Sequence, residues 1–550
     1  MQKTTYRLAP KISARLDGST VLLKPRTFLG AELFDAWRAA VGTAGRYDKV
    51  RKIYVCPRSR YGEIVAAMEA ANFTLLPESW ELKNLPVVEA EKAAARVKGA
   101  EASLALVEKV MPPYGYQREG VVFLATRRRA LLADDQGLGK TYQVLAALPS
   151  DARVLVECPA VARSTWSRDA AALRPDLRVV YPSGPILQAP KPGEMLICSY
   201  EDITRRVDLL DEKSYGPVRP LPQVSHLVVD EAHYLKNRKS RRTRAHIAVE
   251  AQSEVAWLLS GTPMPNAPME LWQVLESAGL AHIAFGTWDR FVDLFGGTRE
   301  KIRTSGNKFR TIVTFPSLEG DRDLFEQIRA EVRPLLAQVM LRRRKKEVLK
   351  DLPDKRTTFL DVEVDQAVLR ECEVVLENER LDASTITDET ALPLHAFAPI
   401  RKQLALAKLP AAIELVEQHE ETETPLVVFS AHRAPVEKIG GRKGWARIDG
   451  EIGDKQRRAT VEAFQAGELK GVACTITAAG TSLTLTHASD ELFVDLDWSP
   501  GNNAQASDRC HRIGQKRGVL ITVLQANHPL DRRMSAVLSR KMLSSAAAIG

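Results

Sequence analysis

The sequence of 550 residues has only six cysteines, and none of them forms a CxxC pair or a cluster with histidine. It therefore offers neither a disulfide framework nor the ligand spacing of a zinc site. The first residues, MQKTTYRLAPKISARL, lack the apolar core of a signal peptide, and no uninterrupted apolar run is long enough to span a bilayer. No internal repeat or long low-complexity tract is present, which argues against a solenoid. These absences predict a soluble protein of a reducing compartment with no membrane partner.

The composition is that of a globular protein with a mild basic excess. Hydrophobic residues make up 45% and charged residues 27% of the chain, which is enough material for two or three packed domains. Lys and Arg number 78 against 69 Asp and Glu, giving a formal charge of +9. This excess agrees with a polyanionic partner, although many soluble proteins share it.

The order of strand-like and helix-like segments predicts an α/β fold class. Short β-branched runs alternate with helical patterns from 114 to about 280, and the alternation returns from about 405. Such alternation is typical of parallel sheets covered on both faces. The predicted domains are a small α+β module with a helical linker, a first parallel-sheet lobe, an inter-lobe helical segment and a second lobe, at 1–100, 101–345, 346–404 and 405–550.

The segment LLADDQGLGKTYQVLAAL reads as a buried strand, a glycine-rich turn and a helix, which is the context of a phosphate-binding loop. Gly137 and Gly139 would let backbone N–H groups point at phosphate oxygens. Lys140 is the candidate contact of the β and γ phosphates, and the Thr141 hydroxyl is a candidate magnesium ligand. The pattern GxxxxGK[ST] is missed because Asp134 replaces its first glycine. Taken alone, the motif leaves open a glycine-capped turn followed by an ordinary surface lysine.

The run HLVVDEAH at 226–233 is an apolar strand that ends in two acids. Asp230 fits a magnesium-linked carboxylate, and Glu231 fits the residue that orients and deprotonates the attacking water. A strand that merely runs into an acidic turn is the alternative. Because carboxyl ends of parallel strands meet at one crevice, the two motifs together predict a site for ATP and magnesium.

With both motifs in place, residues 114–525 resemble the Swi/Snf branch of the superfamily-2 helicase-like ATPases. The family loop reads close to DExGLGKT, so DDQGLGKT agrees with the branch. The resemblance implies two RecA-like lobes in tandem and an adenine-recognising Gln117 in YGYQREGVVFL. It implies nucleotide contacts by Asp134, Asp135, Gln136, Gly137, Leu138, Gly139, Lys140 and Thr141. Ser199, Ser260 and Thr262 lie in segments that resemble elements touching nucleic acid or coupling the lobes.

The segment QASDRCHRIGQKR carries the sharpest resemblance in the second lobe. Its spacing puts Gln505, Asp508, Arg509 and Arg512 within about two helical turns, with both arginines on one face. The resemblance implies a catalytic Gln505 and two arginine fingers that reach the γ phosphate when the lobes close.

Two further segments resemble relatives less closely. TITAAGTSLTLTHA matches the family order and implies that Gly480 contacts the nucleotide, but Ser482 and Thr484 depart from the usual Gly and Asn. GRYDKVRKIYVCPRSRYGEIVAAMEAANFTL is similar to the HepA-related module of the annealing helicases, which implies a role on branched DNA. A module used only for packing is the alternative.

The predicted function is an ATP-dependent translocase on double-stranded DNA that uses magnesium, with remodelling or annealing of forked or branched DNA as the finer expectation. A strand-separating helicase and a nucleic-acid-binding scaffold with a degenerate ATPase remain open. Basic runs at 127–130, 238–244 and 342–346 are candidate phosphate-backbone contacts, with a solvated charged face as the alternative for each. A monomer is expected. The compact architecture favours a bacterial or viral source, which implies a cytoplasmic protein, and a eukaryotic source would imply a nuclear one.

Overall fold

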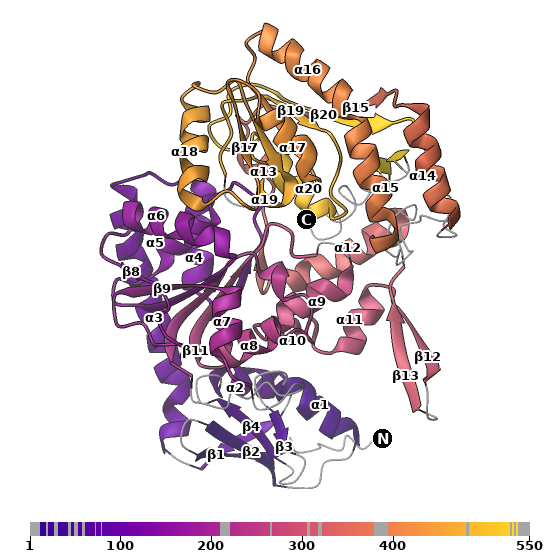
Figure 1. Cartoon of the computed structure of the whole chain (residues 1–550). Helices are drawn as coiled ribbons and strands as arrows, with labels where there is room; N and C mark the ends of the chain where they lie inside the picture. The colour runs from indigo at the N-terminus through magenta and orange to yellow at the C-terminus, as the bar shows by residue number, and fades with distance from the viewer. Residues whose placement is uncertain are drawn as a thin grey trace. The chain divides into compact units, whose positions relative to one another are not determined.

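Across the described residues, the computed structural model contains three parallel or mixed sheets and one β-hairpin (Figure 1). The described residues are 11–17, 20–26, 31–41, 46–48, 53–57, 61–71, 73–78, 80–209, 221–264, 267–304, 308–316, 322–378, 394–479, 483–528, 531–532 and 535–536. The chain divides into two compact units. The first comprises Met1–Ala133, Gly139–Pro316 and Gln327–Arg342, and the second comprises Asp134–Leu138, Ser317–Glu326 and Arg343–Gly550.

The amino-terminal part of the first unit is a small α+β module, as predicted. Its five strands form a sheet in the order β3-β4-β2-β1-β5, in which β5 runs parallel to β1 and the other pairs are antiparallel. Trp37 and Tyr61 lie in its apolar core. The elements are β1 (Lys11–Asp17), β2 (Thr20–Pro25), α1 (Ala31–Val41), β3 (Arg46–Asp48), β4 (Ile53–Pro57), α2 (Tyr61–Ala70) and β5 (Thr74–Pro77).

A seven-stranded, wholly parallel sheet forms the centre of the first unit, in the order β14-β6-β11-β10-β7-β9-β8. Strands β6 and β9 are buried at every position and β7 at all but its first, and most of their residues are apolar because helices cover the sheet. The strands are β6 (Arg129–Leu132), β7 (Arg153–Cys158), β8 (Arg178–Val180), β9 (Glu194–Ser199), β10 (Val224–Val229), β11 (Ser253–Leu259) and β14 (Met340–Leu341).

Helices cover this sheet, and this part of the chain also contains a β-hairpin. Figure 1 shows the hairpin extending as a two-stranded ribbon beyond α11. The remaining elements of this part of the chain are α3 (Trp80–Glu108), α4 (Gly115–Ala125), α5 (Lys140–Ala147), α6 (Arg163–Leu173), α7 (Tyr200–Arg206), α8 (Arg241–Glu250), α9 (Pro268–Glu276), α10 (Leu280–Phe285), α11 (Trp288–Leu294), β12 (Thr298–Thr304), β13 (Lys308–Thr314) and α12 (Arg322–Leu336), with short 3-10 turns at Ala160–Ala162 and Ala232–Leu235.

The second unit is built on a six-stranded parallel sheet in the order β15-β20-β19-β16-β18-β17. Its strands are β15 (Lys355–Val362), β16 (Leu426–Ser430), β17 (Trp445–Ile448), β18 (Gly471–Thr475), β19 (Asp490–Phe493) and β20 (Val519–Ala526). Its helices are α13 (Lys345–Val348), α14 (Gln366–Asn378), α15 (Leu394–Ala407), α16 (Leu409–Glu421), α17 (Arg433–Gly440), α18 (Asp454–Gln465), α19 (Ile476–Ala479) and α20 (Pro500–Ser507). The predicted fold class of two parallel-sheet lobes is therefore confirmed.

The elements do not all follow the predicted segmentation. Helix α3 runs unbroken across residue 100, and β15 lies within 346–404, where a helical or linker segment was expected. β15 was missed because it is an edge strand, exposed at every position but its last, and its sequence KRTTFLDV carries little apolar signal. Across the described residues, no helix has the combined length and hydropathy needed to cross a membrane.

Candidate nucleotide site

The predicted phosphate loop lies between β6 and α5. Gly137 and Gly139 both have left-handed backbone conformations, with φ of 82° and 74°. Gly139 precedes the first residue of α5, and a Cβ there would come within 2.5 Å of Gln117 Nε2. Glycine is favoured at 139 by its left-handed backbone angle, and a Cβ there would also require the end of the Gln117 side chain to move.

Gln117, the expected adenine-recognising residue, lies on α4 beside this turn. Its side chain is buried, with 5% of its surface exposed, and its Oε1 accepts a hydrogen bond from the Tyr114 backbone N–H at 3.0 Å. The Tyr114 ring is exposed and stacks on Tyr116 at 5.7 Å. The structure thus brings Gln117 next to the loop glycine 22 positions later in the chain, which is the juxtaposition that a nucleotide site requires.

The two acids of the HLVVDEAH segment follow the carboxyl end of β10, two strands from β6 in the sheet. Burial, reinforced by the neighbouring Glu231 carboxylate, raises the pKa of Asp230 to about 6, while the Lys140 ammonium opposes that rise. Lys140 therefore acts on Asp230 through space. The loop lysine and the strand-end carboxylates, separated by 90 positions in sequence, share one electrostatic environment.

Glu231 adopts a left-handed conformation, with φ of 52°, which is uncommon for a residue with a side chain. Its Oε2 lies 3.2 Å from His233 Nδ1, and the same His233 nitrogen lies 3.2 Å from Ser260 Oγ. Ser260 Oγ also accepts from the Thr262 backbone N–H at 3.3 Å. Ser260 and Thr262 are thus linked to the acidic segment through His233.

Ser199 has a local role in the structure. It is the N-cap of α7, and its hydroxyl accepts from the Asp202 backbone N–H while the Asp202 carboxylate accepts from the Ser199 backbone N–H. This reciprocal capping box satisfies the free donors at the start of the helix. Its predicted role in touching nucleic acid or coupling the lobes stays a prediction.

The first residues of the loop, Asp134–Leu138, group with the second unit. Asp134 is fully buried, and its carboxylate accepts two hydrogen bonds from Arg343, at 3.0 and 2.6 Å. Asp135 accepts from the Lys345 backbone N–H at 3.1 Å. Asp134 therefore shapes the loop through Arg343, since both of its oxygens are engaged by that guanidinium.

The two predicted arginine fingers are not on a helix, which corrects the expected geometry. Helix α20 ends at Ser507, so Arg509 and Arg512 lie in the turns that follow it. The cause is Gln515, whose buried amide donates to the carbonyls of Thr486, Ala488 and Cys510 and ties the chain into a compact turn. These side-chain bonds to the backbone replace the continuing helix.

The other residues of this segment are held within the second unit. Arg509 and Gln505 are buried. Arg512 donates to the Leu483 carbonyl at 2.6 Å and to Thr484 Oγ1 at 3.2 Å. Asp508 pairs with Lys345 at 3.0 Å and with Lys355 at 2.9 Å. Gly480 and Ser482, named from the sequence, lie outside the described residues.

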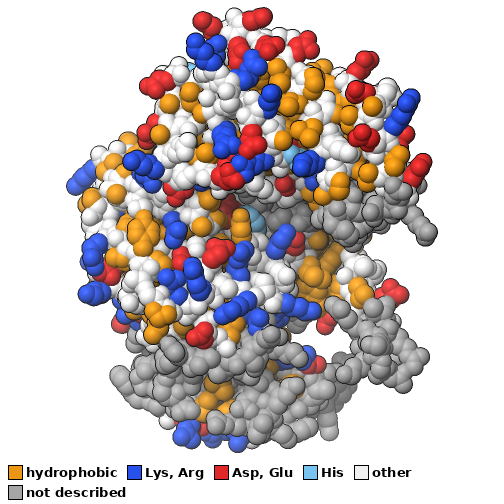
Figure 2. All heavy atoms as spheres, in the orientation of Figure 1, with side chains coloured by type: hydrophobic (Ala, Val, Ile, Leu, Met, Phe, Trp, Pro, Cys, Tyr) orange, Lys and Arg blue, Asp and Glu red, His pale blue; other side chains and the backbone are white. Residues whose placement is uncertain are grey.

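The basic runs are only partly available to a polyanion. Arg129 is buried and pairs with Glu250 at 2.6 Å, while Arg343 and Lys345 are buried in the ion pairs already described. The run at 238–244 is different, because Arg238, Lys239 and Arg241 are exposed. On the face shown in Figure 2, Lys and Arg side chains gather over the region of α7 and α8.

The donors present fit magnesium bound together with a nucleotide. Among the described residues there is no group of three or more His, Cys, Asp or Glu side chains that could hold a metal alone. Magnesium characteristically takes one or two protein oxygens and completes its shell with phosphate and water. The Thr141 hydroxyl and the Asp230 carboxylate, both half-buried, are oxygen donors of that kind.

Two buried aromatic residues that the sequence did not single out contact the acids. The Trp166 indole N–H donates to Asp230 Oδ2 at 2.9 Å, and the Tyr200 hydroxyl donates to the Asp230 carbonyl at 2.8 Å. Both residues are 1% exposed. No spacing rule links them to Asp230, since they come from α6 and α7 and meet it only in the folded sheet.

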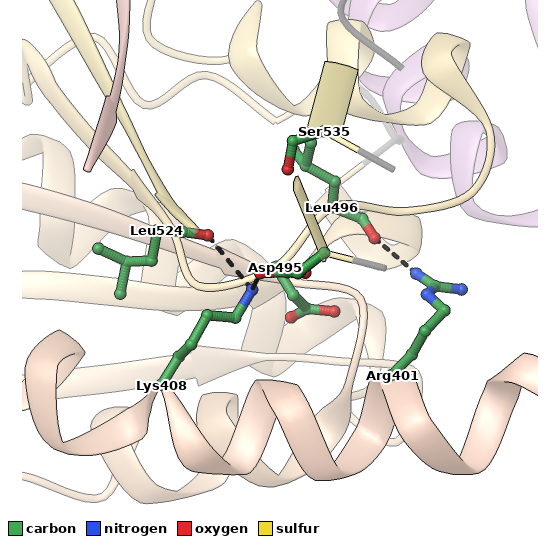
Figure 3. Close-up of a pocket in the computed structure, with 7 residues that line it drawn as sticks. Arg401, Lys408, Asp495, Leu496, Leu524 and Ser535 are labelled. Carbon is green, nitrogen blue, oxygen red and sulfur yellow. Dashed lines mark hydrogen bonds and ion pairs between the residues drawn. The ribbon is translucent and has the colours of Figure 1, made fainter. Parts of the chain in front are cut away.

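A small cavity in the second unit is lined by residues that hydrogen-bond to the protein itself (Figure 3). It measures about 10 Å³, roughly the space of one water molecule. Lys408, which is 1% exposed, lines the cavity and donates to the Leu524 carbonyl at 3.2 Å and to Asp531 at 2.9 Å. Arg401 also lines it and donates to the Leu496 carbonyl at 2.6 Å. These bonds tie Asp531 to the end of β20.

Comparison with known families finds two matches along the chain. Residues 116–372 match the SNF2-related domain and residues 407–514 match the helicase conserved C-terminal domain. Over 457 residues the chain is 27% identical to the SWI/SNF-related matrix-associated actin-dependent regulator of chromatin subfamily A-like protein 1 homolog of Caenorhabditis elegans, covering 80% of this chain and 61% of the relative. Over 453 residues it is 28% identical to the DNA annealing helicase and endonuclease ZRANB3 of Homo sapiens, covering 79% of this chain and 40% of the relative.

These relatives are animal proteins, so they do not support the expected bacterial or viral source, and the chain spans only about half of their length. Among solved structures, the Sulfolobus solfataricus SWI2/SNF2 ATPase core in complex with dsDNA matches with a TM-score of 0.36 and 20% identity, covering 80% of this chain and 96% of that chain.

Proposed function

The chain belongs to the Swi/Snf-type helicase-like ATPases, and from that premise we propose that it hydrolyses ATP and uses the energy to move along double-stranded DNA. Nucleotide use follows from the family. The specific activity, duplex translocation, is our proposal for this chain.

The observation that carries the proposal is the placement of two motifs on one parallel sheet. The glycine-rich loop and Lys140 follow β6, and Asp230 and Glu231 follow β10, two strands away, so both motifs lie at the carboxyl edge of the sheet. We assign Lys140 to the β and γ phosphates, Thr141 and Asp230 to magnesium, and Glu231 to the attacking water. Magnesium, when bound, neutralises charge on the phosphates. Glu231 is suited to act as the base because its left-handed backbone turns it out of the strand direction, and its carboxylate lies beside His233.

The second unit contributes residues whose catalytic roles remain predictions. Arg509 and Arg512 would supply positive charge to the transition state, and Gln505 would assist them. Arg512 now donates to Leu483 and Thr484, so its guanidinium would have to exchange at least one of these bonds for a phosphate oxygen.

Duplex DNA is the proposed partner because of the family and the exposed basic residues of 238–244. Such residues contact phosphates without reading sequence. Action on forked or branched DNA is the finer proposal. It is supported by the similarity to a relative named as a DNA annealing helicase.

An ATPase assay with four DNA conditions tests this function. ATP hydrolysis is measured without DNA and with single-stranded, duplex and forked DNA, alongside Glu231→Gln as the inactive control. We expect duplex DNA to stimulate hydrolysis at least about tenfold and Glu231→Gln to abolish it. Equal rates in all four conditions would reject the motor, and stimulation by single strands alone would favour a strand-separating helicase.

A further inference from the structure

Two hydrogen-bond donors from different helices converge on the Asp230–Glu231 turn. Trp166, on α6, directs its indole N–H to Asp230 Oδ2 at 2.9 Å. Tyr200, at the start of α7, donates its hydroxyl to the Asp230 carbonyl at 2.8 Å, with the Glu231 carbonyl at 3.3 Å. Trp166 thus contacts the side chain of the turn, and Tyr200 contacts its backbone.

The Asp230 carboxylate is held at both oxygens. Oδ1 accepts from the Glu231 backbone N–H at 3.0 Å, and Oδ2 accepts from Trp166. Each carboxylate oxygen has two acceptor positions, so this arrangement fixes the orientation of the group and still leaves one position on each oxygen for a cation or water. An indole N–H can only donate, so Trp166 always presents a donor to Asp230 Oδ2.

The Tyr200 hydroxyl is equally well fixed. Its ring stacks on Tyr234 at 5.4 Å with an interplanar angle of 11°, and the Arg242 guanidinium lies 5.4 Å from each ring. This stack fixes the Tyr200 hydroxyl beside the Asp230–Glu231 turn, in which Glu231 has φ of 52°. A left-handed residue with a side chain persists only where its surroundings determine it, and the Tyr200 hydroxyl is one of the groups bonded to this turn.

We propose that Trp166 and Tyr200 are positioning residues for ATP hydrolysis. Trp166 orients the Asp230 carboxylate toward the metal of the bound nucleotide, and Tyr200 fixes the backbone turn that aims Glu231 at the attacking water. Neither residue touches the reacting atoms. The inference rests on the proposed ATPase function and adds the residues on which its two acids depend.

The chain offers a matched control for Trp166. Trp257, on β11, is also 1% exposed, and its indole N–H donates to the Arg127 carbonyl at 3.1 Å, a backbone acceptor outside the proposed nucleotide site. Trp166→Phe and Trp257→Phe therefore each remove one buried indole N–H and replace a fused two-ring side chain with a single ring. Their thermal stabilities report the structural cost of the exchange in both places.

The readout that separates positioning from packing is the magnesium dependence of nucleotide binding. Fluorescent mant-ATP is titrated onto the Glu231→Gln background at several magnesium concentrations, and kcat is measured in the Glu231 background. For Trp166→Phe we expect the magnesium concentration at half-maximal binding to rise about tenfold and kcat to fall about tenfold or more, as for loss of an outer-shell partner. Trp257→Phe should change neither. An unchanged magnesium dependence in Trp166→Phe, or equal changes in both variants, would overturn the role of Trp166.

Tyr200→Phe removes only the hydroxyl and keeps the stacked ring. We expect kcat to fall about tenfold while the KM for ATP and the magnesium titration stay at wild-type values, because the aim of Glu231 is altered and the metal site is not. A wild-type kcat, or a raised KM with unchanged kcat, would overturn the role of Tyr200. Wild-type protein that neither binds mant-ATP nor hydrolyses ATP would instead reject the proposed function together with this inference, whereas a selective loss in the variants leaves that function intact.

Discussion

At the scale of single residues, Gln136 is the least satisfied member of the phosphate loop. It is 9% exposed, and neither its amide oxygen nor its amide nitrogen has a hydrogen-bond partner among the described residues. A buried unpaired amide lowers stability. Because Gln136 lies in the loop that we assign to the phosphates, we expect a bound nucleotide to supply its hydrogen-bond partner.

Gln136→Met removes the unpaired amide and keeps the volume. We expect the variant without nucleotide to be more stable by roughly 1 kcal/mol, because no buried polar group is left unpaired. We expect its affinity for mant-ATP to fall several-fold, because the amide can no longer pair with the ligand. Chemical denaturation and a binding titration measure the two effects. A variant that is less stable and binds nucleotide equally well would contradict this role.

Asp134 acts through a buried ion pair. Arg343 has 8% of its side chain exposed and the Asp134 carboxylate none, so removal of one partner leaves the other charge buried. We expect Asp134→Asn to lower the free energy of unfolding by about 3 kcal/mol or more. Urea denaturation measures the loss.

The exposed pair of Arg433 and Glu437 provides the control for that experiment. Glu437→Gln removes two charge pairs in contact with water, those with Arg433 and Arg447, and such exposed pairs contribute little to stability. Similar stability losses in Asp134→Asn and Glu437→Gln would contradict this prediction, because they would show that water reaches the pair of Asp134 and Arg343.

At the scale of elements, strand β19 carries a buried acid in the second sheet. Burial raises the pKa of Glu491 to about 8, against the opposing pull of the Lys355 ammonium. Between its ordinary pKa of 4.5 and 8, the folded chain holds this proton and the unfolded chain releases it. The Glu491 contribution to stability therefore becomes less favourable as pH rises through that range.

Glu491→Gln removes this pH-dependent cost. The Tm of the variant relative to wild type should therefore increase between pH 5 and pH 8, corresponding at pH 8 to a gain on the order of 1–3 kcal/mol. Differential scanning fluorimetry across this range checks the trend. A Tm difference that is constant with pH, or that shrinks as pH rises, would show that Glu491 ionises normally in the folded protein.

The elements that could be predicted from sequence are those with buried, periodic patterns. The strand before the phosphate loop and the strand HLVVDEAH are continuous apolar runs because helices cover both faces of a parallel sheet. Edge strand β15 lacks that signal, since it is half polar and exposed. The predicted helical face of Arg509 and Arg512 was wrong because the Gln515 amide binds backbone carbonyls that local spacing does not reveal.

The residues of the candidate site also fall into those that the sequence could identify and those that it could not. Lys140, Asp230 and Glu231 belong to local motifs and could be named from the sequence, and the structure places Lys140 in the electrostatic environment of Asp230. Trp166 and Tyr200 could not, because their contacts with the acids depend on the order of strands in the sheet. Long-range contacts between side chains leave no fixed spacing in the sequence.

At the scale of the whole molecule, two family domains follow one another along the chain. The first match contains the whole seven-stranded sheet and extends to β15, and the second contains β16 to β19 of the six-stranded sheet. The residues proposed for the nucleotide site on the first sheet would account for ATP hydrolysis even if the protein did not move along DNA. Movement along the duplex is the additional claim, and it concerns the work that the two domains do together. The monomeric state and the preference for branched DNA stay predictions.

Triplex displacement tests movement most directly. A third strand bound in the major groove of a duplex is released when a motor passes beneath it, without separation of the duplex strands. We predict release that requires ATP and is abolished in Glu231→Gln. Release without ATP, or ATP hydrolysis stimulated by duplex DNA with no release of the third strand, would contradict translocation.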